Sequence, residues 1–217
     1  MAGLLVVVSV EPERQALVED AALGEYPGFD VVVGGVGPAV AAAATAMHLV
    51  RAQERGSPYG MVICAGIAGG FAGRAEPGAT VLASRVIAAD LGADSADGFL
   101  PLDQLGFGHS TLDVDAVLLA ALRKRRPDAV VGAVLTVATV TGTAERAAQL
   151  LARHPDAAAE GMEGYGVASA AALAGVAFAE LRTVSNRIGP RDRSTWRIPD
   201  ALAALSASAP ALVSLTQ

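Results

Sequence analysis

The chain has 217 residues and a formal net charge of −6, and it is 53% hydrophobic and 18% charged, with 24 glycines. This length suits one α/β domain over residues 1–217, and the hydrophobic content excludes an intrinsically disordered chain. The net negative charge argues against a nucleic-acid-binding protein, because contacts with phosphates need a basic surface.

The predicted elements alternate between apolar strands and helices. We expect a buried strand over Leu4–Val10, a helix from Pro12 to Asp20 and a strand over Phe29–Val33. Pro38 suits the first turn of a helix over Ala39–Arg51. The later expectations are, in chain order, a strand Met61–Ala65 closed by a glycine turn over 66–70, a strand Ala79–Ile87, a helix Asp113–Arg123, a strand Val130–Thr139, helices Ala144–Arg153 and Gly166–Leu173, a strand Ala177–Ser185, and a terminal helix Asp200–Leu215 that Pro210 kinks or divides.

Uninterrupted apolar strands that alternate with helices predict an α/β fold with a mostly parallel sheet covered on both faces. In such sheets a ligand binds beyond the carboxyl ends of the strands. The segment Ala88–Ser110 is rich in Gly, Asp and Phe and has little periodicity. We expect it to be a long functional or mobile loop.

Three features bear on the setting of the protein. Cys64 is the single cysteine and lies in the apolar run 61–65, which predicts a reduced, buried thiol in a cytoplasmic protein. The N-terminus has no basic segment, and Leu4–Val10 is too short to cross a bilayer, so we expect no membrane association. The basic run Arg123–Arg126 precedes Pro127, and it is interpreted as a solvated helix end where cations favour the helix dipole.

Several catalytic signatures are missing from the sequence. His48, His109 and His154 are scattered and have no cysteine or carboxylate at metal-ligand spacing, so we expect no metal. There is no Gly-x-Ser-x-Gly motif of a serine hydrolase. The run Gly34–Ala39 lacks the last glycine of a dinucleotide fingerprint, and we expect no cofactor.

Carboxylates and an amide remain at the predicted strand ends. Glu11 and Glu13 follow the first strand, Glu163 precedes an Ala-rich helix, and Asn186 ends a late strand. Singly, each has an ordinary structural explanation. Acids favour a helix N-terminus by about 0.3–1 kcal/mol, and asparagine is common in turns.

Together, four segments resemble the nucleoside phosphorylase and nucleosidase superfamily, particularly its purine nucleosidases. Within it, the runs 185–199 and 97–108 resemble the futalosine hydrolase family. The resemblance implies a three-layer α/β/α subunit with a mixed, mostly parallel central sheet, in a homo-oligomer, and it implies a nucleoside substrate. The four segments are Val6–Glu13, Gly35–Gly37 before an Ala-rich helix, Ala65–Gly70, and Met162–Glu163 followed by Ser185–Asn186.

The same resemblance implies a role for each matching residue. Glu13 matches the acid that deprotonates the attacking water, with Glu11 as the competing choice. Glu163 matches the acceptor of the ribose 2′- and 3′-hydroxyls, and Met162 the apolar residue against the sugar. The amide of Asn186 donates to a 6-oxo group and accepts from a protonated N7, which points to hypoxanthine. Further residues expected at the substrate are Ile67, Ala68, Gly69 and Val140.

Water is expected to be the nucleophile. Phosphorylases of this superfamily carry an Arg and a Ser where this chain has Cys64 and Ile67, and an apolar side chain cannot bind a phosphate dianion. Futalosine carries a benzoate-bearing tail, for which Phe99 and Phe107 are the expected apolar contacts. Arginines near Trp196 (Arg191, Arg193 and Arg197) are weaker candidates.

Two other functions stay open at this point. One is a nucleosidase or phosphorylase for simple nucleosides such as inosine or methylthioadenosine. The other is a non-catalytic nucleoside-binding protein on the same fold, which would be expected to lack the water-activating acid.

Overall fold

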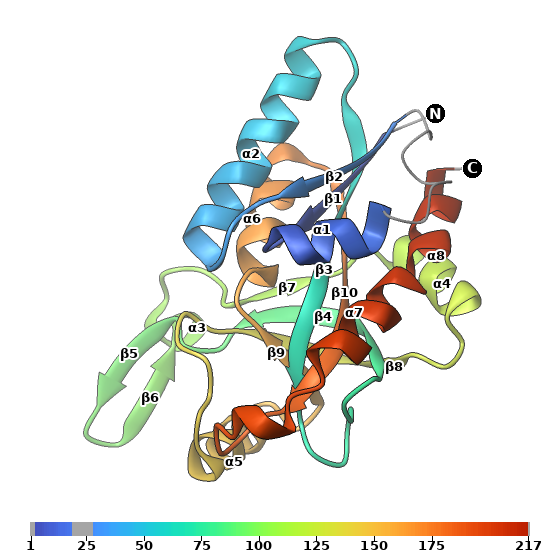
Figure 1. Ribbon diagram of the computed structural model, residues 1–217. Coiled ribbons are helices and arrows are strands. Elements are labelled where there is room, and N and C mark those ends of the chain that lie inside the picture. Colours follow the sequence, from blue (N-terminus) through green and yellow to red (C-terminus); the bar gives the residue numbers. More distant parts are fainter. Residues whose placement is uncertain (1–2, 19–27, 217) are drawn as a thin grey trace.

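The computed structural model describes residues 3–18 and 28–216. Most of its strands alternate with helices, as the apolar periodicity predicts (Figure 1). The strands are β1 (Gly3–Val8), β2 (Phe29–Val33), β3 (Tyr59–Gly70), β4 (Thr80–Ala88), β5 (Gly92–Ser95), β6 (Gly98–Pro101), β7 (Thr111–Asp113), β8 (Val130–Thr136), β9 (Ala157–Gly161) and β10 (Ala177–Arg187). The helices are α1 (Glu11–Val18), α2 (Pro38–Glu54), α3 (Leu102–Leu105), α4 (Ala116–Arg125), α5 (Ala144–Arg153), α6 (Gly164–Ala174), α7 (Ile198–Ser206) and α8 (Ala209–Val213), with short 3-10 turns at Arg193–Thr195 and Ser214–Thr216.

One large sheet carries the fold. Its strand order is β10-β4-β8-β9-β3-β1-β2, and β7 pairs with β4. Five of its eight pairings are parallel and three are antiparallel. In addition, β10 pairs with β3. This pairing closes part of the sheet into a ring of five strands, β3, β10, β4, β8 and β9. The predicted mixed, mostly parallel sheet is confirmed, and its closure is an addition to that prediction.

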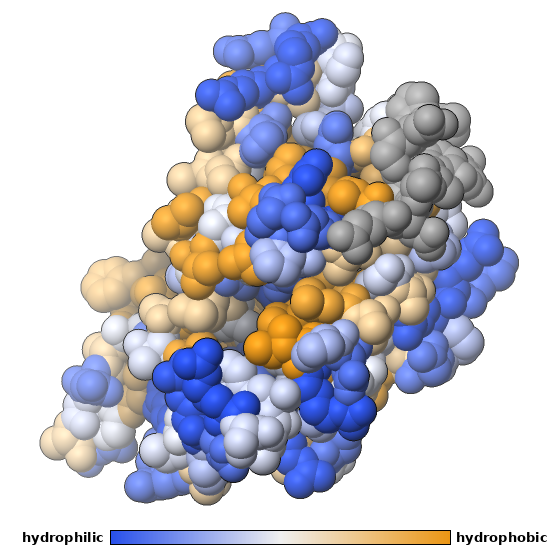
Figure 2. All heavy atoms as spheres, viewed as in Figure 1, coloured by the Kyte–Doolittle hydropathy of each residue, from blue (hydrophilic) through white to orange (hydrophobic). Residues whose placement is uncertain are grey.

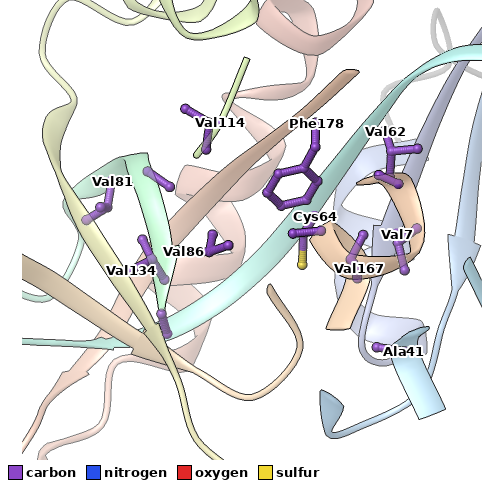
Figure 3. Packing of buried hydrophobic residues seen from close by; sticks show 14 of the residues in the cluster. Val7, Ala41, Val62, Cys64, Val81, Val86, Val114, Val134, Val167 and Phe178 are labelled. Atoms are coloured by element: carbon purple, nitrogen blue, oxygen red, sulfur yellow. The ribbon is translucent and has the colours of Figure 1, made fainter. Parts of the chain in front are cut away.

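The inner strands of the large sheet bury both of their faces. In β1, Leu5 and Val7 pack into one core cluster, which includes residues of α2 and α6, while Leu4, Val6 and Val8 pack into a second cluster with residues of α1, α4 and α7. Figure 3 shows the first cluster, in which Val7 and Cys64 approach Val167 of α6. Each such buried aliphatic side chain contributes about 1.5–3 kcal/mol. The two clusters on opposite faces establish the three-layer α/β/α arrangement.

The end of β3 differs from the prediction. The glycine run 66–70 was expected to be a turn, but it continues the strand, pairing with β10 and, at Gly69 and Gly70, with β9. Glycine is unfavourable in a strand unless another group approaches the backbone closely. As described below, a carboxylate does so here.

Other boundaries also move. The segment Ala88–Ser110, predicted to be an irregular loop, contains the β5–β6 hairpin and α3. The helix predicted from Asp113 begins at Ala116, because the Asp115 side chain accepts from the N–H groups of Val117 and Leu118 and caps it. The strand predicted to reach Thr139 ends at Thr136.

Further corrections concern the start of the chain and the basic run. The first strand ends at Val8 rather than Val10, because the N–H groups of Ser9 and Val10 turn to the Glu13 side chain. The predicted end of the first helix, Asp20, lies outside the described residues. Arg126 is not solvated as predicted, since its guanidinium donates to Ser208 and Thr80.

By length and composition alone, one described segment, Ile198–Thr216, is apolar enough to cross a membrane. It is divided into α7, α8 and a 3-10 turn, with Pro210 in the first turn of α8. Ala201 and Leu205 of α7 are fully buried in the core. Core helices of water-soluble folds pass the same test, so the indication of a membrane span is weak.

Candidate active site

The Glu13 side chain is held in place at the tip of β1. Because α1 begins three residues after β1 ends, the carboxylate turns back toward the strand. Its Oε2 accepts from the backbone N–H of Ser9 at 2.8 Å and of Val10 at 3.2 Å, and its Oε1 accepts from the N–H of Ile67 at 2.8 Å. The residue is only 2% exposed. Three N–H donors therefore fix one buried carboxylate in a single orientation.

The neighbouring acid, Glu11, is placed differently. It lies on the surface, and its carboxylate pairs with Arg14 at 3.1 Å, where both side chains are well exposed. The geometry thus separates the two acids that the sequence left in competition, and it favours Glu13 as the chemically constrained one.

Gly66 explains why β3 continues through glycines. A Cβ atom at this position would lie 2.5 Å from Oε1 of Glu13, closer than any real contact allows. The missing side chain lets the carboxylate reach the strand and accept from Ile67. The glycine run therefore belongs to the site, although it is a strand and not a turn.

A second buried acid, Glu163, lies between β9 and α6. Its Oε1 accepts from the N–H of Gly37 at 3.2 Å, and its Oε2 accepts from the N–H of Met162 at 3.3 Å. Oε2 also lies 3.3 Å from Nη2 of Arg182. Since Gly37 precedes α2, Glu163 joins the start of that helix to the sheet. Met162 beside it is half-buried.

Arg182 is fully buried in β10 and connects the two acids. Its Nη2 contacts Glu163 and lies 3.2 Å from Sγ of Cys64, while its Nη1 lies 3.4 Å from the carbonyl oxygen of Ile67. Burial alone would lower the pKa of Arg182, but the nearby acids Glu180, Glu163 and Glu13 raise it well above its usual range. Arg182 is therefore a permanent cation between Glu163 and the residue that holds Glu13.

Glu180 completes this charged group. Its Oε1 accepts from Nε of Arg182 at 2.7 Å, and the carboxylate fills the space where a Cβ at Gly164 would stand. Burial raises the pKa of Glu180, and its Oε2 has no hydrogen-bond partner among the described residues. The alternation of Glu180 and Arg182 in an apolar strand was a usable signal in the sequence, because charges two residues apart share one face of a strand. Neither residue was among the predicted site residues.

Asn186 lies farther along β10, paired with Gly69 of β3. Its Oδ1 accepts from Oγ of Ser185 at 2.8 Å, and its Nδ2 donates to the carbonyl of Arg187 at 3.0 Å. Asn186 lines a cavity that holds three of the predicted substrate residues together: Asn186 itself, Gly69 and Val140. The other residues that line the cavity are Thr141, Glu160, Arg187, Ile188, Gly189, Pro190, Arg191 and Trp196.

Glu13 and Asn186 therefore lie along one stretch of β3. Glu13 approaches Gly66 and Ile67, and Asn186 pairs with Gly69. A strand rises about 3.3 Å per residue, so these two points are on the order of 10 Å apart. Glu13 and Glu163 are not among the residues that line the cavity at Asn186. The strand segment 66–69 is the element common to both parts of the site.

A sequence profile described as the phosphorylase superfamily matches residues 7–216. A futalosine hydrolase from Streptomyces coelicolor is 49% identical, over 94% of this chain and 92% of its own length. A futalosine hydrolase from Thermus thermophilus is 34% identical, over 82% of this chain and 78% of its own length. This chain belongs to the futalosine hydrolase family.

Solved structures agree on the fold. A futalosine hydrolase of Helicobacter pylori has a TM-score of 0.80 at 14% identity, covering 99% of this chain and 98% of its own. A second solved structure is a 5′-methylthioadenosine/S-adenosylhomocysteine nucleosidase of Colwellia psychrerythraea in complex with adenine. It has a TM-score of 0.77 at 24% identity, covering 98% of this chain and 93% of its own. At these identities the likeness concerns the fold alone, and the sequence relatives carry the membership in the futalosine hydrolase family.

Two residues suggested for the tail of a futalosine hydrolase substrate lie in or after the β5–β6 hairpin, which projects from the body of the molecule (Figure 1). The ring of Phe99 stacks on the guanidinium of Arg153 at 4.4 Å, and Phe107 is 80% exposed. Neither is among the residues that line the cavity at Asn186. His109 is exposed as well, and its Nδ1 lies 3.2 Å from Asp103.

The arginines near Trp196 are only partly gathered. Arg191 and Arg193 each lie 5.6 Å from the Trp196 ring, and Arg191 and Trp196 line the cavity with Asn186. Arg197 pairs instead with Asp200. Across residues 3–18 and 28–216, no three His, Cys, Asp or Glu side chains come together as a metal site.

Proposed function

We propose that this protein hydrolyses the N-ribosidic bond of futalosine, releasing hypoxanthine and dehypoxanthine futalosine in menaquinone biosynthesis. Membership in the futalosine hydrolase family supports the substrate. The observation that carries the chemistry is the buried Glu13 carboxylate, which three N–H groups orient at the same strand segment that pairs with Asn186.

In this proposal Glu13 is the base for the attacking water. An ionised carboxylate has about four lone-pair sites. Two N–H groups bond Oε2 and one bonds Oε1, which leaves one site on Oε1 for a proton of water. A carboxylate is a weak base, but it is sufficient here. The ribosyl group becomes an electrophilic oxocarbenium ion as the purine departs, and such an ion reacts readily with water. The fixed orientation lowers the entropy that must be lost when water is positioned.

Glu163 is the proposed acceptor for the ribose 2′- and 3′-hydroxyls, with Met162 against the sugar. Its contact with Arg182 directs the carboxylate, and hydrogen bonds to charged groups are stronger than those between neutral ones. At the other end, Asn186 is proposed to donate to O6 and to accept from N7–H of the leaving base. The donation to O6 stabilises the negative charge that develops on the purine, and a proton from water, taken up at N7, neutralises that charge. Gly69, Val140, Ile67 and Ala68 would form the walls beside them.

Several contacts favour water over phosphate. Ile67 offers no cationic or hydroxyl side chain, and the Glu13 carboxylate would repel a dianion at the same place. Arg14 is directed to Glu11 and to the carbonyl of Val31, and the donors of Arg182 are already engaged. Hydrolysis therefore fits the charges better than phosphorolysis.

The test is an assay of purine release from futalosine, inosine and methylthioadenosine, with and without inorganic phosphate. We expect turnover of futalosine that phosphate does not accelerate. If inosine or methylthioadenosine is turned over as fast as futalosine or faster, the protein is a nucleosidase for simple nucleosides. If turnover depends on phosphate, it is a phosphorylase. Tight binding of futalosine without turnover would favour a nucleoside-binding protein.

We also propose a cytoplasmic homo-oligomer that associates through α2. The outer face of this helix is apolar, with Val40, Met47 and Val50 each about half exposed, and Val36, just before the helix, is about half exposed as well. Figure 2 shows apolar residues along α2 below its polar end. Exposed apolar surface of this kind commonly marks an interface. In light scattering, Met47→Glu should shift the protein toward monomer. The control Val117→Glu, on α4, should leave the mass unchanged. The same mass for wild type and Met47→Glu would contradict this.

A further inference from the structure

Glu160 is a buried acid that the proposed mechanism does not use. It lies in β9, is 5% exposed, and lines the same cavity as Asn186. Its Oε1 accepts from the backbone N–H of Thr141 at 2.8 Å, and its Oε2 accepts from Oγ1 of Thr141 at 2.6 Å. Thr141 lines the cavity as well. One side chain thus takes up both hydrogen-bond donors of its neighbour at the wall of the cavity.

Hydrogen bonding to Thr141 does not by itself explain why a carboxylate is buried at this position. Moving an ionised acid out of water costs several kcal/mol unless a cation or several hydrogen bonds compensate. Burial raises the pKa of Glu160, and the described residues provide it with no ion pair within salt-bridge distance. Its two bonds to Thr141 use about half of its acceptor sites. The remaining lone pairs are available to a donor in the cavity.

The chemistry of the purine shows which donor fits. Hypoxanthine presents an acceptor at O6 and a donor at N1–H, whereas adenine presents a donor at its 6-amino group and an acceptor at N1. If Asn186 binds the O6 and N7 edge, N1 is the next polar position around the ring. A site for hypoxanthine must place an acceptor there, and a site for adenine a donor. With its N–H and hydroxyl engaged, Thr141 has no free donor for adenine.

We propose that Glu160 accepts the hydrogen bond of the purine N1–H and, by engaging both donors of Thr141, excludes 6-aminopurines. Glu160 and Asn186 then divide the recognition of a 6-oxopurine between them. The inference rests on the proposed function, since it assigns the purine to the cavity at Asn186. It adds a second specificity-determining residue to that cavity.

The experiment measures binding of the free bases, so it does not depend on turnover. Hypoxanthine, 1-methylhypoxanthine and adenine are titrated calorimetrically into the wild type, Glu160→Gln and Glu160→Leu, with thermal unfolding as a check on folding. The wild type should bind hypoxanthine more tightly than 1-methylhypoxanthine or adenine. Leaving the N1–H donor unpaired should weaken hypoxanthine binding by about 5- to 150-fold in Glu160→Leu. Adenine should bind Glu160→Leu more tightly than it binds the wild type, because the Thr141 N–H is freed. The affinities of Glu160→Gln should lie between those of the wild type and Glu160→Leu.

Glu13→Gln is the matched control, since it removes the proposed base while leaving the cavity at Asn186 unchanged. It should keep the wild-type ratio of hypoxanthine to 1-methylhypoxanthine. The inference is overturned if folded Glu160→Leu and Glu160→Gln keep that ratio, or if they lose hypoxanthine and adenine affinity equally. If wild type binds none of the bases and releases none from futalosine, the proposed function itself fails. Tight hypoxanthine binding that the Glu160 variants leave unchanged rejects only the role of Glu160.

Discussion

The carboxylate of Glu180 occupies the place where a side chain at Gly164 would begin. Gly164 opens α6 directly after Glu163, and Glu180 bonds the Arg182 that contacts Glu163. Gly164 and the buried acid Glu180 are therefore sterically coupled.

This coupling predicts a non-additive pair of mutations. Gly164→Ala should lower the free energy of unfolding by about 1–3 kcal/mol, because the added methyl collides with a packed group. In a Glu180→Ala background the space is empty, and the same methyl should cost much less. Urea unfolding of both singles and the double variant measures the interaction. Gly142→Ala, whose Cβ would meet only an ordinary contact with Arg191, is the control. Equal cost in both backgrounds would contradict the coupling.

A second prediction separates the two acids of the first helix. Glu13→Gln should lower kcat for futalosine about 10²- to 10⁴-fold, the usual range for loss of a general base, with nucleoside binding largely kept. Glu11→Gln, on the exposed side of the same turn, should retain kcat. Steady-state kinetics and equilibrium binding measure the two effects. Near-normal turnover by Glu13→Gln would remove Glu13 from the mechanism.

A third prediction concerns the base. Asn186→Asp replaces a donor and acceptor pair by a carboxyl group, which in its ionised form cannot donate to O6. It should weaken binding of hypoxanthine relative to adenine by about 5- to 150-fold. Competition between the two bases for one site measures this ratio. Asn186 would lose its proposed role if the variant preserved the wild-type preference.

A fourth prediction uses the single thiol. Cys64 is 1% exposed, and burial raises its pKa well above the usual range, so it is neutral at pH 8. Because the thiolate is the reactive form, a disulfide reagent should leave Cys64 unmodified in the folded protein and modify it fully in concentrated guanidinium. Absorbance of the released thiol follows both reactions. Rapid modification of the native protein would show that the core around Arg182 opens readily.

The outline of the fold was predictable because its strands are continuous apolar runs. Val6 to Val8 and Val62 to Ile63 have no other plausible setting than a sheet buried on both faces. The strand β9, over Ala157–Gly161, was missed because alanine favours helices and gives no β signal. It is a strand because β8 and β3 supply its hydrogen bonds, which only the folded chain provides.

The candidate site was open to sequence-based prediction only in part. Glu13, Glu163 and Asn186 stand at ends of elements, where a pattern or a resemblance can find them. Arg182 and Glu180 lie within a strand, and Glu160 meets Thr141 only through a contact 19 residues apart in the chain. Contacts of this kind depend on register between strands, and no local pattern in the sequence fixes that register.

The pairing of β3 with β10 brings residues 61–70 against residues 177–187, more than a hundred positions later. A chain emerging from the ribosome therefore has the proposed water-activating acid long before it has the proposed purine-binding amide. No N-terminal fragment that stops before β10 can bind nucleoside in the proposed manner. Contacts this distant in sequence also form slowly, so activity should be the last property that the refolding protein regains.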